Sequence, residues 1–366
     1  MGNLVIGLGN TGCQIVKVAA ASTALTETKF FAIDSVASSV DSGSLNDIEY
    51  IPIISDDKPR SGRDRERGRA MFQFHQGKGA FNKLYEVAAE SKTPIIAISS
   101  TAGGTGSGSI VPLCESLINK GIDVIPILIC PNKQDPAAFH LNTSDLFLEL
   151  GEIGIRTYAT FENKRGDADY RPINTEVVNM IELLFGKKFD PTDLDAIDES
   201  DLDKLLEMPG RIMAVQAESP SIDTLAQEIT KKLFVGSQPM WKPETVETAT
   251  LMTAFSLKSM FADIDFKRVF AEVNNRIDPD TVYDNYRNIV KDDNDGIASA
   301  AIIITGLPPA EIKEIKGDYK ETRGIGDGVK RSSRPSFLGR KKASTTTTKP
   351  TDGTDPQTMF KWGAEK

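Results

Sequence analysis

The stretch that decides the fold is TAGGTGSGSIVP, Thr101 to Pro112, in which four glycines fall within the six positions from Gly103 to Gly108. The apolar run PIIAISS lies directly upstream, and a helical pattern follows from Ser109 to Asn119. Glycine lets backbone N–H groups approach an anion closely, and the N-terminus of a following helix adds a favourable dipole. The stretch therefore predicts a phosphate-binding loop. A tight turn is the simpler interpretation of such a loop taken alone.

A second glycine-rich loop, GLGNTG from Gly7 to Gly12, also follows an apolar run and precedes a helical pattern, CQIVKVAAAS. It matches G-x-G-x-x-G, which also occurs in dinucleotide-binding enzymes, where Asp34 would hold a ribose. The first stretch lacks the Lys of a Walker loop. Ligands of parallel sheets bind at the carboxyl ends of the strands, where both loops fall. Two such loops are harder to explain as turns than one.

The first half of the chain alternates short apolar runs with helical patterns, which indicates a parallel sheet covered on both faces. The runs are NLVIGLG, KFFAIDS, PIIAISS and DVIPILIC, and a helix is expected around Gly68 to Glu90. After Asn163 comes the helical pattern INTEVVNMIELLF and then an acidic stretch from Asp190 to Asp203. The sequence therefore predicts a first α/β domain that ends before a long helix.

A second, smaller α/β unit is expected after the acidic stretch, and it closes near Pro309. Its predicted elements are the strand RIMAVQA, the helix IDTLAQEITKKLF, a strand around Thr250 to Leu257, a helix through Val282, and the last strand ASAAIIITGLPP.

Composition indicates a soluble protein of a reducing compartment. Of 366 residues, 39% are hydrophobic and 26% charged, and no segment approaches the ~20 apolar residues of a membrane helix. Cys13, Cys114 and Cys130 are widely spaced and odd in number, which fits neither a disulfide framework nor a zinc site. We therefore expect a cytoplasmic protein without a membrane partner.

The net charge of −9 hides a basic segment, because seven Lys or Arg and no acid fall between Gly328 and Lys349. Beyond about Lys320 the chain is rich in Gly, Ser, Thr and Pro, which predicts disorder. Such a tail is either a solubilising linker or an electrostatic arm for nucleic acid or an acidic partner.

The motif GGTGSGS between an apolar strand and a helix resembles the signature loop of the tubulin/FtsZ superfamily of GTP-binding filament proteins. It is closer to the tubulin and TubZ form than to the GGGTGTG of FtsZ. GNTGCQI, Gly9 to Ile15, resembles the first nucleotide loop of the family, and FFAIDS resembles the second. The resemblance covers roughly residues 3 to 310 and leaves out the tail.

The resemblance implies a Rossmann-like GTPase domain over residues 1–172, a central helix over 173–190, a smaller α/β C-terminal domain over 191–315 and a disordered basic tail over 316–366. It implies GTP or GDP as ligand, with Mg²⁺. Asn163 would contact the ribose and Asn174 a guanine edge, and Asp34 would lie near the ribose or the metal. The other implied nucleotide-binding residues are Gly9, Asn10, Gly12, Cys13, Gln14, Gly103, Gly104, Thr105, Gly106 and Ser107.

The catalytic loop of the family has the form N-x-D-x-x-[D/E], and AIDESD matches it with Asp198 and Asp201 as the acids and Ala196 in place of Asn. Carboxylates orient a water against the γ-phosphate. In this family they come from the next subunit, so that hydrolysis requires assembly. A solvated acidic loop with a helix N-cap is the alternative. DIDFKRV, Asp263 to Val269, also resembles the FtsZ loop, but it lies in the wrong chain order and has Arg268 in place of the acid.

The resemblance therefore predicts a GTPase that polymerises head to tail, for segregation or positioning of plasmid or phage DNA. The segment Lys330 to Lys349 would engage DNA or a DNA-bound adaptor. A divergent FtsZ-like division protein is a second possibility. A monomeric dinucleotide-dependent enzyme is the alternative from another class, and it gives GGTGSGS no role.

Overall fold

The computed structural model describes residues 2–36, 48–54, 61–91, 93–163, 170–186, 197–238, 250–274, 276–277, 279–291 and 296–308. The chain divides into two units, Met1–Lys316 and Gly317–Lys366. The predicted basic tail, including Lys330 to Lys349, lies outside the described residues.

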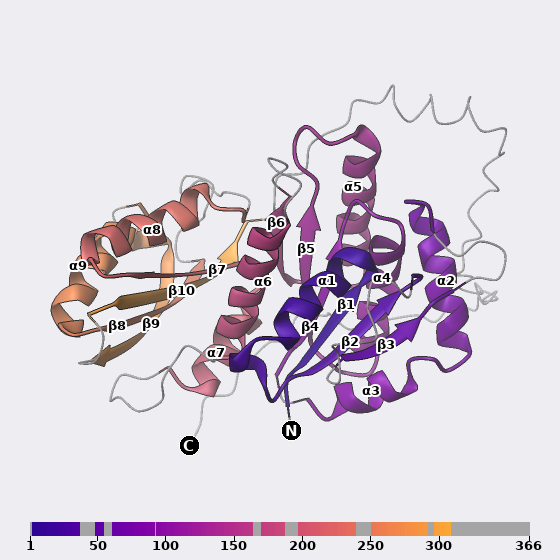
Figure 1. Ribbon diagram of the computed structural model, residues 1–366, viewed down its shortest axis with the longest axis horizontal. Helices are drawn as coiled ribbons and strands as arrows, with labels where there is room; N and C mark the ends of the chain where they lie inside the picture. Colours follow the sequence, from indigo (N-terminus) through magenta and orange to yellow (C-terminus); the bar gives the residue numbers. More distant parts are fainter. Residues whose placement is uncertain are drawn as a thin grey trace, which may run out of the picture. The chain divides into compact units, whose positions relative to one another are not determined.

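The strands of the described chain form one ten-stranded sheet in the order β3-β2-β1-β4-β5-β6-β7-β10-β8-β9 (Figure 1). They are β1 Leu4–Leu8, β2 Lys29–Asp34, β3 Ile48–Pro52, β4 Ile95–Ser100, β5 Val124–Cys130, β6 Thr157–Glu162, β7 Gly210–Ser219, β8 Leu251–Ser259, β9 Val282–Lys291 and β10 Ala298–Leu307. All neighbours from β3 to β7 pair in parallel, whereas β10 runs antiparallel to both β7 and β8. The parallel strands therefore end at one common edge, which we call the carboxyl edge.

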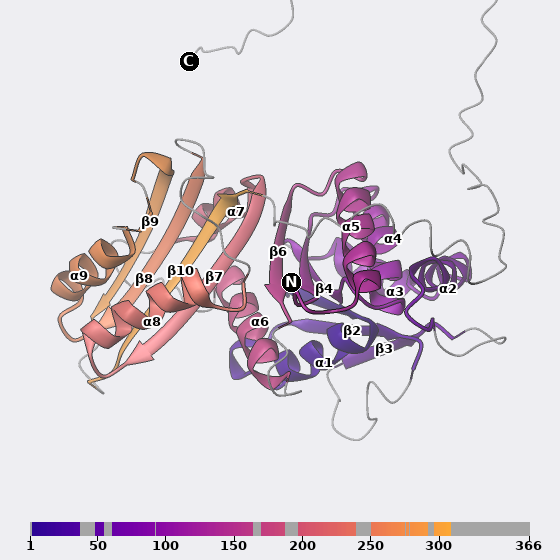
Figure 2. The ribbon, with the colours of Figure 1, turned by 90° about the horizontal axis from the view of Figure 1, so that it is seen from above.

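Helices cover both faces of the parallel part of the sheet, and two further helices pack on its antiparallel part (Figure 2). The helices are α1 Gly9–Ala20, α2 Arg65–Gly77, α3 Asn82–Ala89, α4 Thr105–Ile118, α5 Ala137–Glu152, α6 Arg171–Leu184, α7 Glu199–Glu207, α8 Ile222–Val235 and α9 Ala262–Asn274, with 3₁₀ turns at Thr23–Leu25 and Pro279–Thr281. One core joins α1, α6 and α7 to the sheet, and a second joins α2 to α5 to its other face. A third core packs α8 and α9 against β7, β8 and β10.

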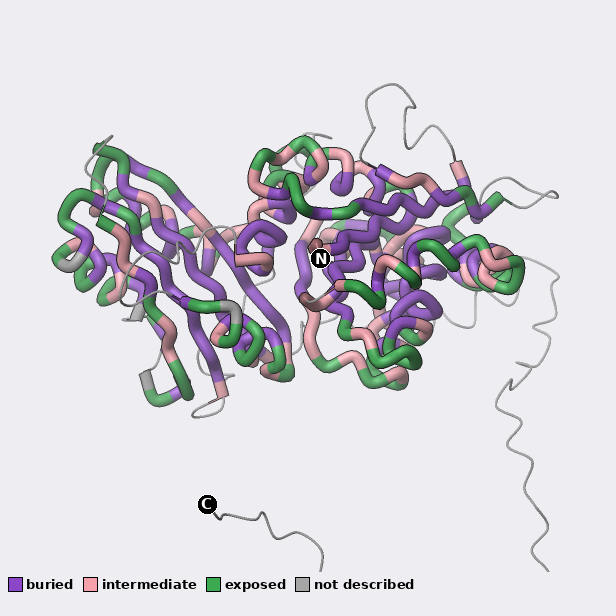
Figure 3. Tube along the Cα trace, turned by 90° about the horizontal axis from the view of Figure 1, so that it is seen from below, coloured by how far each residue is buried: buried purple, intermediate pink, exposed green. Residues whose placement is uncertain are grey.

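Burial on both faces explains why these strands are apolar over most of their length and do not alternate between apolar and polar residues (Figure 3). In β1 every residue from Leu4 to Leu8 is buried. No helix in the described part of the chain is long and apolar enough to cross a membrane.

Two predicted helices were wrong. The single helix expected around Gly68 to Glu90 is two helices, α2 and α3, because Gly79 between them has φ +77° and breaks the helical path. The helix expected through Val282 ends at Asn274, and Val282 begins the edge strand β9, which pairs with β8. The sheet is continuous across the two predicted α/β domains, 1–172 and 191–315. Strand β6 of the first range pairs with β7 of the second, with Thr157 opposite Gly210.

Candidate functional site

The strand order reverses at β1, because β2 and β3 lie on one side of it and β4, β5 and β6 on the other. Such a topological switch point opens a crevice at the carboxyl edge, where ligands of parallel α/β sheets bind. The two glycine-rich loops follow β1 and β4, the two strands that flank this switch point. α1 then packs on one face of the sheet and α4 on the other.

Two helix N-termini meet in this crevice. The residues preceding α1 and α4 are Leu8 and Gly104, and neither donates a side chain that caps the helix. Neither helix has an acidic residue in its first turn. Their backbones touch, since a Cβ on Gly9 would lie 2.7 Å from the amide nitrogen of Gly106. Uncapped N–H groups and two helix dipoles therefore converge on one point, and this arrangement attracts an anion such as phosphate.

Hydroxyl groups from two further segments gather beside Thr105, the first residue of α4. Thr105 Oγ1 lies 3.1 Å from Ser35 Oγ and 3.0 Å from Ser61 Oγ, and all three residues are buried. The Ser35 amide donates to Asp34 Oδ1 over 2.7 Å. The crevice thus offers the buried carboxylate of Asp34 and three buried hydroxyls, which come from the end of β2, the segment before α2 and the start of α4.

Gly103 and Gly104 have different surroundings, although both are predicted from the sequence to bind nucleotide. A Cβ on Gly104 would lie 2.4 Å from Ser61 Oγ and 2.7 Å from the Asp64 amide nitrogen, so this glycine is needed for packing. A Cβ on Gly103 would meet nothing within 4 Å. Gly103 therefore faces open space at the helix N-terminus, and it is the better position for a test of ligand binding.

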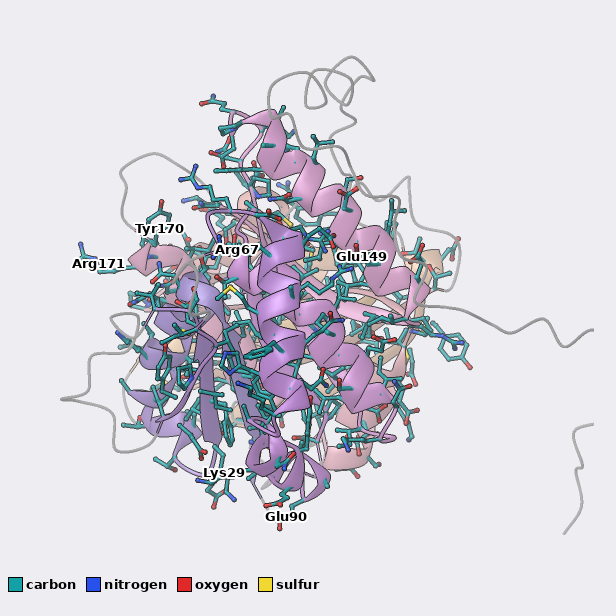
Figure 4. The ribbon with its side chains drawn as sticks, turned by 90° about the vertical axis from the view of Figure 1, so that its right-hand side faces the viewer. Lys29, Arg67, Glu90, Glu149, Tyr170 and Arg171 are labelled. Carbon is teal, nitrogen blue, oxygen red and sulfur yellow. The ribbon has the colours of Figure 1, made fainter. Side chains whose placement is uncertain are left out.

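The N-terminus of α6 borders the same edge. Asn163 follows β6, and its backbone N–H donates to the Cys130 carbonyl over 2.9 Å. Asn174 is half-buried near the start of the helix, and its backbone N–H donates to the Tyr170 carbonyl. Tyr170 itself is 48% exposed. Figure 4 shows Tyr170 and Arg171 at the carboxyl edge, opposite Lys29 and Glu90. Sequence reasoning missed Tyr170, whose position four residues before Asn174 puts both on one helix face.

Helix α6 runs from this edge to the opposite one. Near its start Glu176 accepts a hydrogen bond from Ser237, whose carbonyl binds the amide of Glu162 at the end of β6. Near its end Glu182 accepts a bond of 2.6 Å from Ser22, just beyond α1. Its 14 residues span about 21 Å at 1.5 Å per residue.

Asp198 and Asp201 lie beyond the C-terminal end of α6, away from the glycine loops. At that end Leu202 of α7 packs against Gly186. They form a capping box on α7, because Asp198 Oδ1 accepts from the Asp201 amide over 2.9 Å and Asp201 Oδ2 accepts from the Asp198 amide. Hydrogen bonds from the Ser200 hydroxyl and from the backbone amide of Asp201 hold the pKa of the Asp198 carboxyl below its usual value. The N-cap expected as the alternative is present, and both acids remain accessible to a partner.

Many solved structures share this architecture, and three of them are compared with this chain. TubZ of Bacillus thuringiensis serovar israelensis, in a GTPγS-form protofilament, aligns with a TM-score of 0.66 at 16% identity, over 89% of this chain and 94% of its own. CetZ1 of Haloferax volcanii, a GDP-bound monomer, gives 0.65 at 17%, over 89% and 98%. FtsZ of M. jannaschii, as a W319Y mutant, gives 0.63 at 17%, over 84% and 91%. The chain has the tubulin/FtsZ fold. No protein-family model and no curated protein matches the sequence.

Within this tubulin/FtsZ fold a second set of residues holds the glycine-rich loop between β4 and α4 from behind. Arg65 is 5% exposed, and its guanidinium donates to the Ser107 carbonyl over 3.4 Å and to Glu149 Oε2 over 2.7 Å. Asn142 donates to the carbonyls of Ala102 and Arg63. Helices α2 and α5 therefore fix the loop through side chains that no sequence motif identifies.

Cys13 takes part in the fold through its side chain. Its thiol is fully buried and donates to the carbonyls of Gly7 and Ile33, both over 3.8 Å. Burial, and then the nearby Asp34 carboxylate, raise the pKa of this thiol, and the same causes raise the pKa of Tyr50 to about 12. Only the backbone of Cys13 is therefore available to a ligand, whereas Asn10 is exposed and Gln14 half-buried on the same helix.

Proposed function

We propose that this protein binds GTP and hydrolyses it in a head-to-tail filament. The observation that carries the proposal is the pair of uncapped helix N-termini at the β1/β4 switch point, beside Asp34 and three buried hydroxyls. The solved structures of similar fold add support, since they include a GDP-bound CetZ1 monomer and GTPγS-form protofilaments of CetZ2 and TubZ. No Walker lysine is needed, because backbone N–H groups and helix dipoles supply the positive potential.

Guanine recognition is assigned to the start of α6. The exposed ring of Tyr170 offers a surface on which a base stacks, and the amide of Asn174 offers a donor and an acceptor to its edge. The ribose contact is assigned to Asn163, which directly follows β6 at the carboxyl edge. The phosphates then extend toward α1 and α4.

The residues beside Thr105 fit Mg²⁺. This ion prefers oxygen ligands and is usually bound through one or two carboxylates together with substrate phosphates. Asp34 supplies the carboxylate, and Ser35, Ser61 and Thr105 supply hydroxyls. When bound, the ion would neutralise charge on the phosphates. In the described chain there is no cluster of three His, Cys, Asp or Glu that would hold a metal by itself.

Hydrolysis is assigned to Asp198 and Asp201 of the adjacent subunit. Within one chain about 21 Å of α6 separates these acids from the N-terminal end of that helix. A head-to-tail contact brings the edge at which the parallel strands begin in one subunit to the carboxyl edge of the next subunit. Such heterologous contacts give open filaments. The acids then orient water against the γ-phosphate.

We further propose plasmid or phage DNA as cargo, with Lys330 to Lys349 as the arm that engages DNA or its adaptor. The proposal rests on the charge of that segment alone, because it lies outside the described residues. The dinucleotide-enzyme alternative rested on GLGNTG and left the second glycine loop without a role.

The first experiment compares thermal protection by GTP, GDP and NAD, together with pelleting in GTP, GDP and a non-hydrolysable analogue. Protection by GTP and GDP but not NAD, with GTP-dependent pelleting, is the expected result. Protection by NAD alone would overturn the proposal.

The second experiment tests catalysis between subunits. Asp201→Ala should bind GTP and form persistent filaments without turnover, and Gly103→Ala should lose binding. Mixed at equal amounts, the two inactive variants should recover up to about a quarter of the wild-type rate, because one contact in four joins an intact pocket to intact acids. Wild-type turnover by Asp201→Ala would move the catalytic loop elsewhere, with Asp263 and Asp265 next to test.

A further inference from the structure

An arginine occupies a backbone position that favours glycine, directly beside the phosphate loop. Residues Ser61 to Asp64 form a turn in which the Asp64 amide donates to the Ser61 carbonyl over 3.2 Å. The central residues, Gly62 and Arg63, have φ of +65° and +68°, as in a type I′ turn. Among the described residues Arg63 is the one non-glycine with positive φ. A side chain in this conformation is strained, and strain of this kind gathers at functional sites.

The turn is fixed against the phosphate loop on three sides. Ser61 Oγ lies 3.0 Å from Thr105 Oγ1, and the backbone of Arg63 and Asp64 packs on Gly104 without room for a Cβ. The side-chain amide of Asn142 donates to the Arg63 carbonyl over 3.4 Å. Arg63 therefore extends from a fixed point next to the N-terminus of α4.

The guanidinium of Arg63 is held weakly in the described part of the chain. The residue is exposed, and its guanidinium carbon lies 4.9 Å from the centroid of the Phe139 ring. Across the described ranges it forms no ion pair, in contrast to Arg65 and Arg69, which both bind Glu149. The cation–π contact is weak enough at an exposed site to exchange for a stronger ligand.

We propose that Arg63 leaves Phe139 when a nucleoside triphosphate binds, and donates to the oxygens of its terminal phosphate. This inference rests on the proposed function. The planar guanidinium matches two phosphate oxygens at once, and charge-assisted bonds of this kind are strong. The turn lies beside Thr105, whereas Tyr170 and Asn174 lie at the start of α6. With the base assigned to α6, the phosphate nearest Arg63 is the terminal one, which GDP lacks.

The test measures affinities of the full chain for GTPγS and GDP with Mg²⁺, at protein concentrations that give no pelleting. Arg63→Gly removes the guanidinium and relaxes the backbone, and Arg63→Asn retains a side chain that tolerates positive φ. Arg276→Ala is the matched control, since Arg276 is also exposed and lies over an aromatic ring, Phe234, at 5.9 Å.

Both Arg63 variants should bind GTPγS about 10- to 100-fold more weakly than wild type, with GDP affinity changed less than about twofold. Arg276→Ala should leave both affinities unchanged. Unchanged GTPγS affinity in both Arg63 variants, or an equal loss for GTPγS and GDP, would overturn the assignment. A wild-type chain that binds neither nucleotide would instead refute the proposed function.

Discussion

Glu149→Ala should destabilise the protein more than any single surface change, because one carboxylate serves two arginines. Glu149 Oε2 lies 2.7 Å from Arg65 Nη2 and also accepts from Arg69. Arg65 is 5% exposed, so its charge has almost no access to water once the carboxylate is gone. Figure 4 shows Glu149 at the same end of the molecule as Arg67 on α2.

The expected loss follows from burial. Removing one partner of a buried pair costs about 3–5 kcal/mol, since an uncompensated charge remains. The Glu149 and Arg69 side chains are 24% and 25% exposed, so water relieves part of this cost and the lower end applies, about 3 kcal/mol. The unit Met1–Lys316 is large, and at about 2.1 cal/mol/K of unfolding entropy per residue each kcal/mol shifts the midpoint by about 1.5 °C. The midpoint of thermal unfolding should therefore fall by about 4–5 °C.

Urea unfolding at pH 7 measures this loss, with Glu49→Gln as the control. Glu49 pairs with Lys83, whose side chain is 68% exposed, and such pairs contribute less than about 1 kcal/mol. The double variant Arg65→Met with Glu149→Leu should recover most of the loss, because it removes the buried Arg65 charge together with the carboxylate, and the remaining Arg69 side chain is 25% exposed to water. A loss in Glu149→Ala no larger than in Glu49→Gln, or a double variant no more stable than Glu149→Ala, would refute the buried-charge argument.

Three other outcomes are expected. Gly103→Ala should keep the unfolding midpoint of wild type and lose nucleotide binding, measured by thermal shift with and without GTP, whereas Gly104→Ala should also lower the midpoint because its Cβ meets Ser61. Cys13 and Cys114 should resist iodoacetamide at pH 8 until urea unfolds the chain, because both thiols are buried with raised pKa, and rapid labelling of the native protein would contradict this. Truncation near Lys320 should preserve GTP-dependent pelleting and abolish salt-sensitive DNA cosedimentation, and equal DNA recovery with both proteins would remove the arm from the mechanism.

The sequence was sufficient to predict the parallel sheet and the placement of its glycine loops. Continuous apolar runs such as PIIAISS occur where both faces of a strand are buried, and the glycines mark the point where a strand turns into a helix. The antiparallel part of the sheet was harder to predict. β9 has one neighbouring strand and a largely exposed surface, so VYDNYRNIVK carries too weak an apolar pattern to separate it from the preceding helix.

The residues that complete the site were not predictable from the sequence, because they meet only when distant loops converge. Ser61 is 44 positions from Thr105, and Arg65 is 84 positions from Glu149, without a fixed spacing that a motif could record. Glycines can be recognised in a sequence because few other residues permit a close approach of two backbones. Residues with hydroxyl or charged side chains are not restricted to such positions, so a sequence pattern does not mark them. Which of them come into contact depends on which strand ends are adjacent. The strand order β3-β2-β1-β4 makes those ends adjacent, so the glycine-rich loop before α4 is encoded locally, while the hydroxyls beside it and its supporting arginine are encoded by topology.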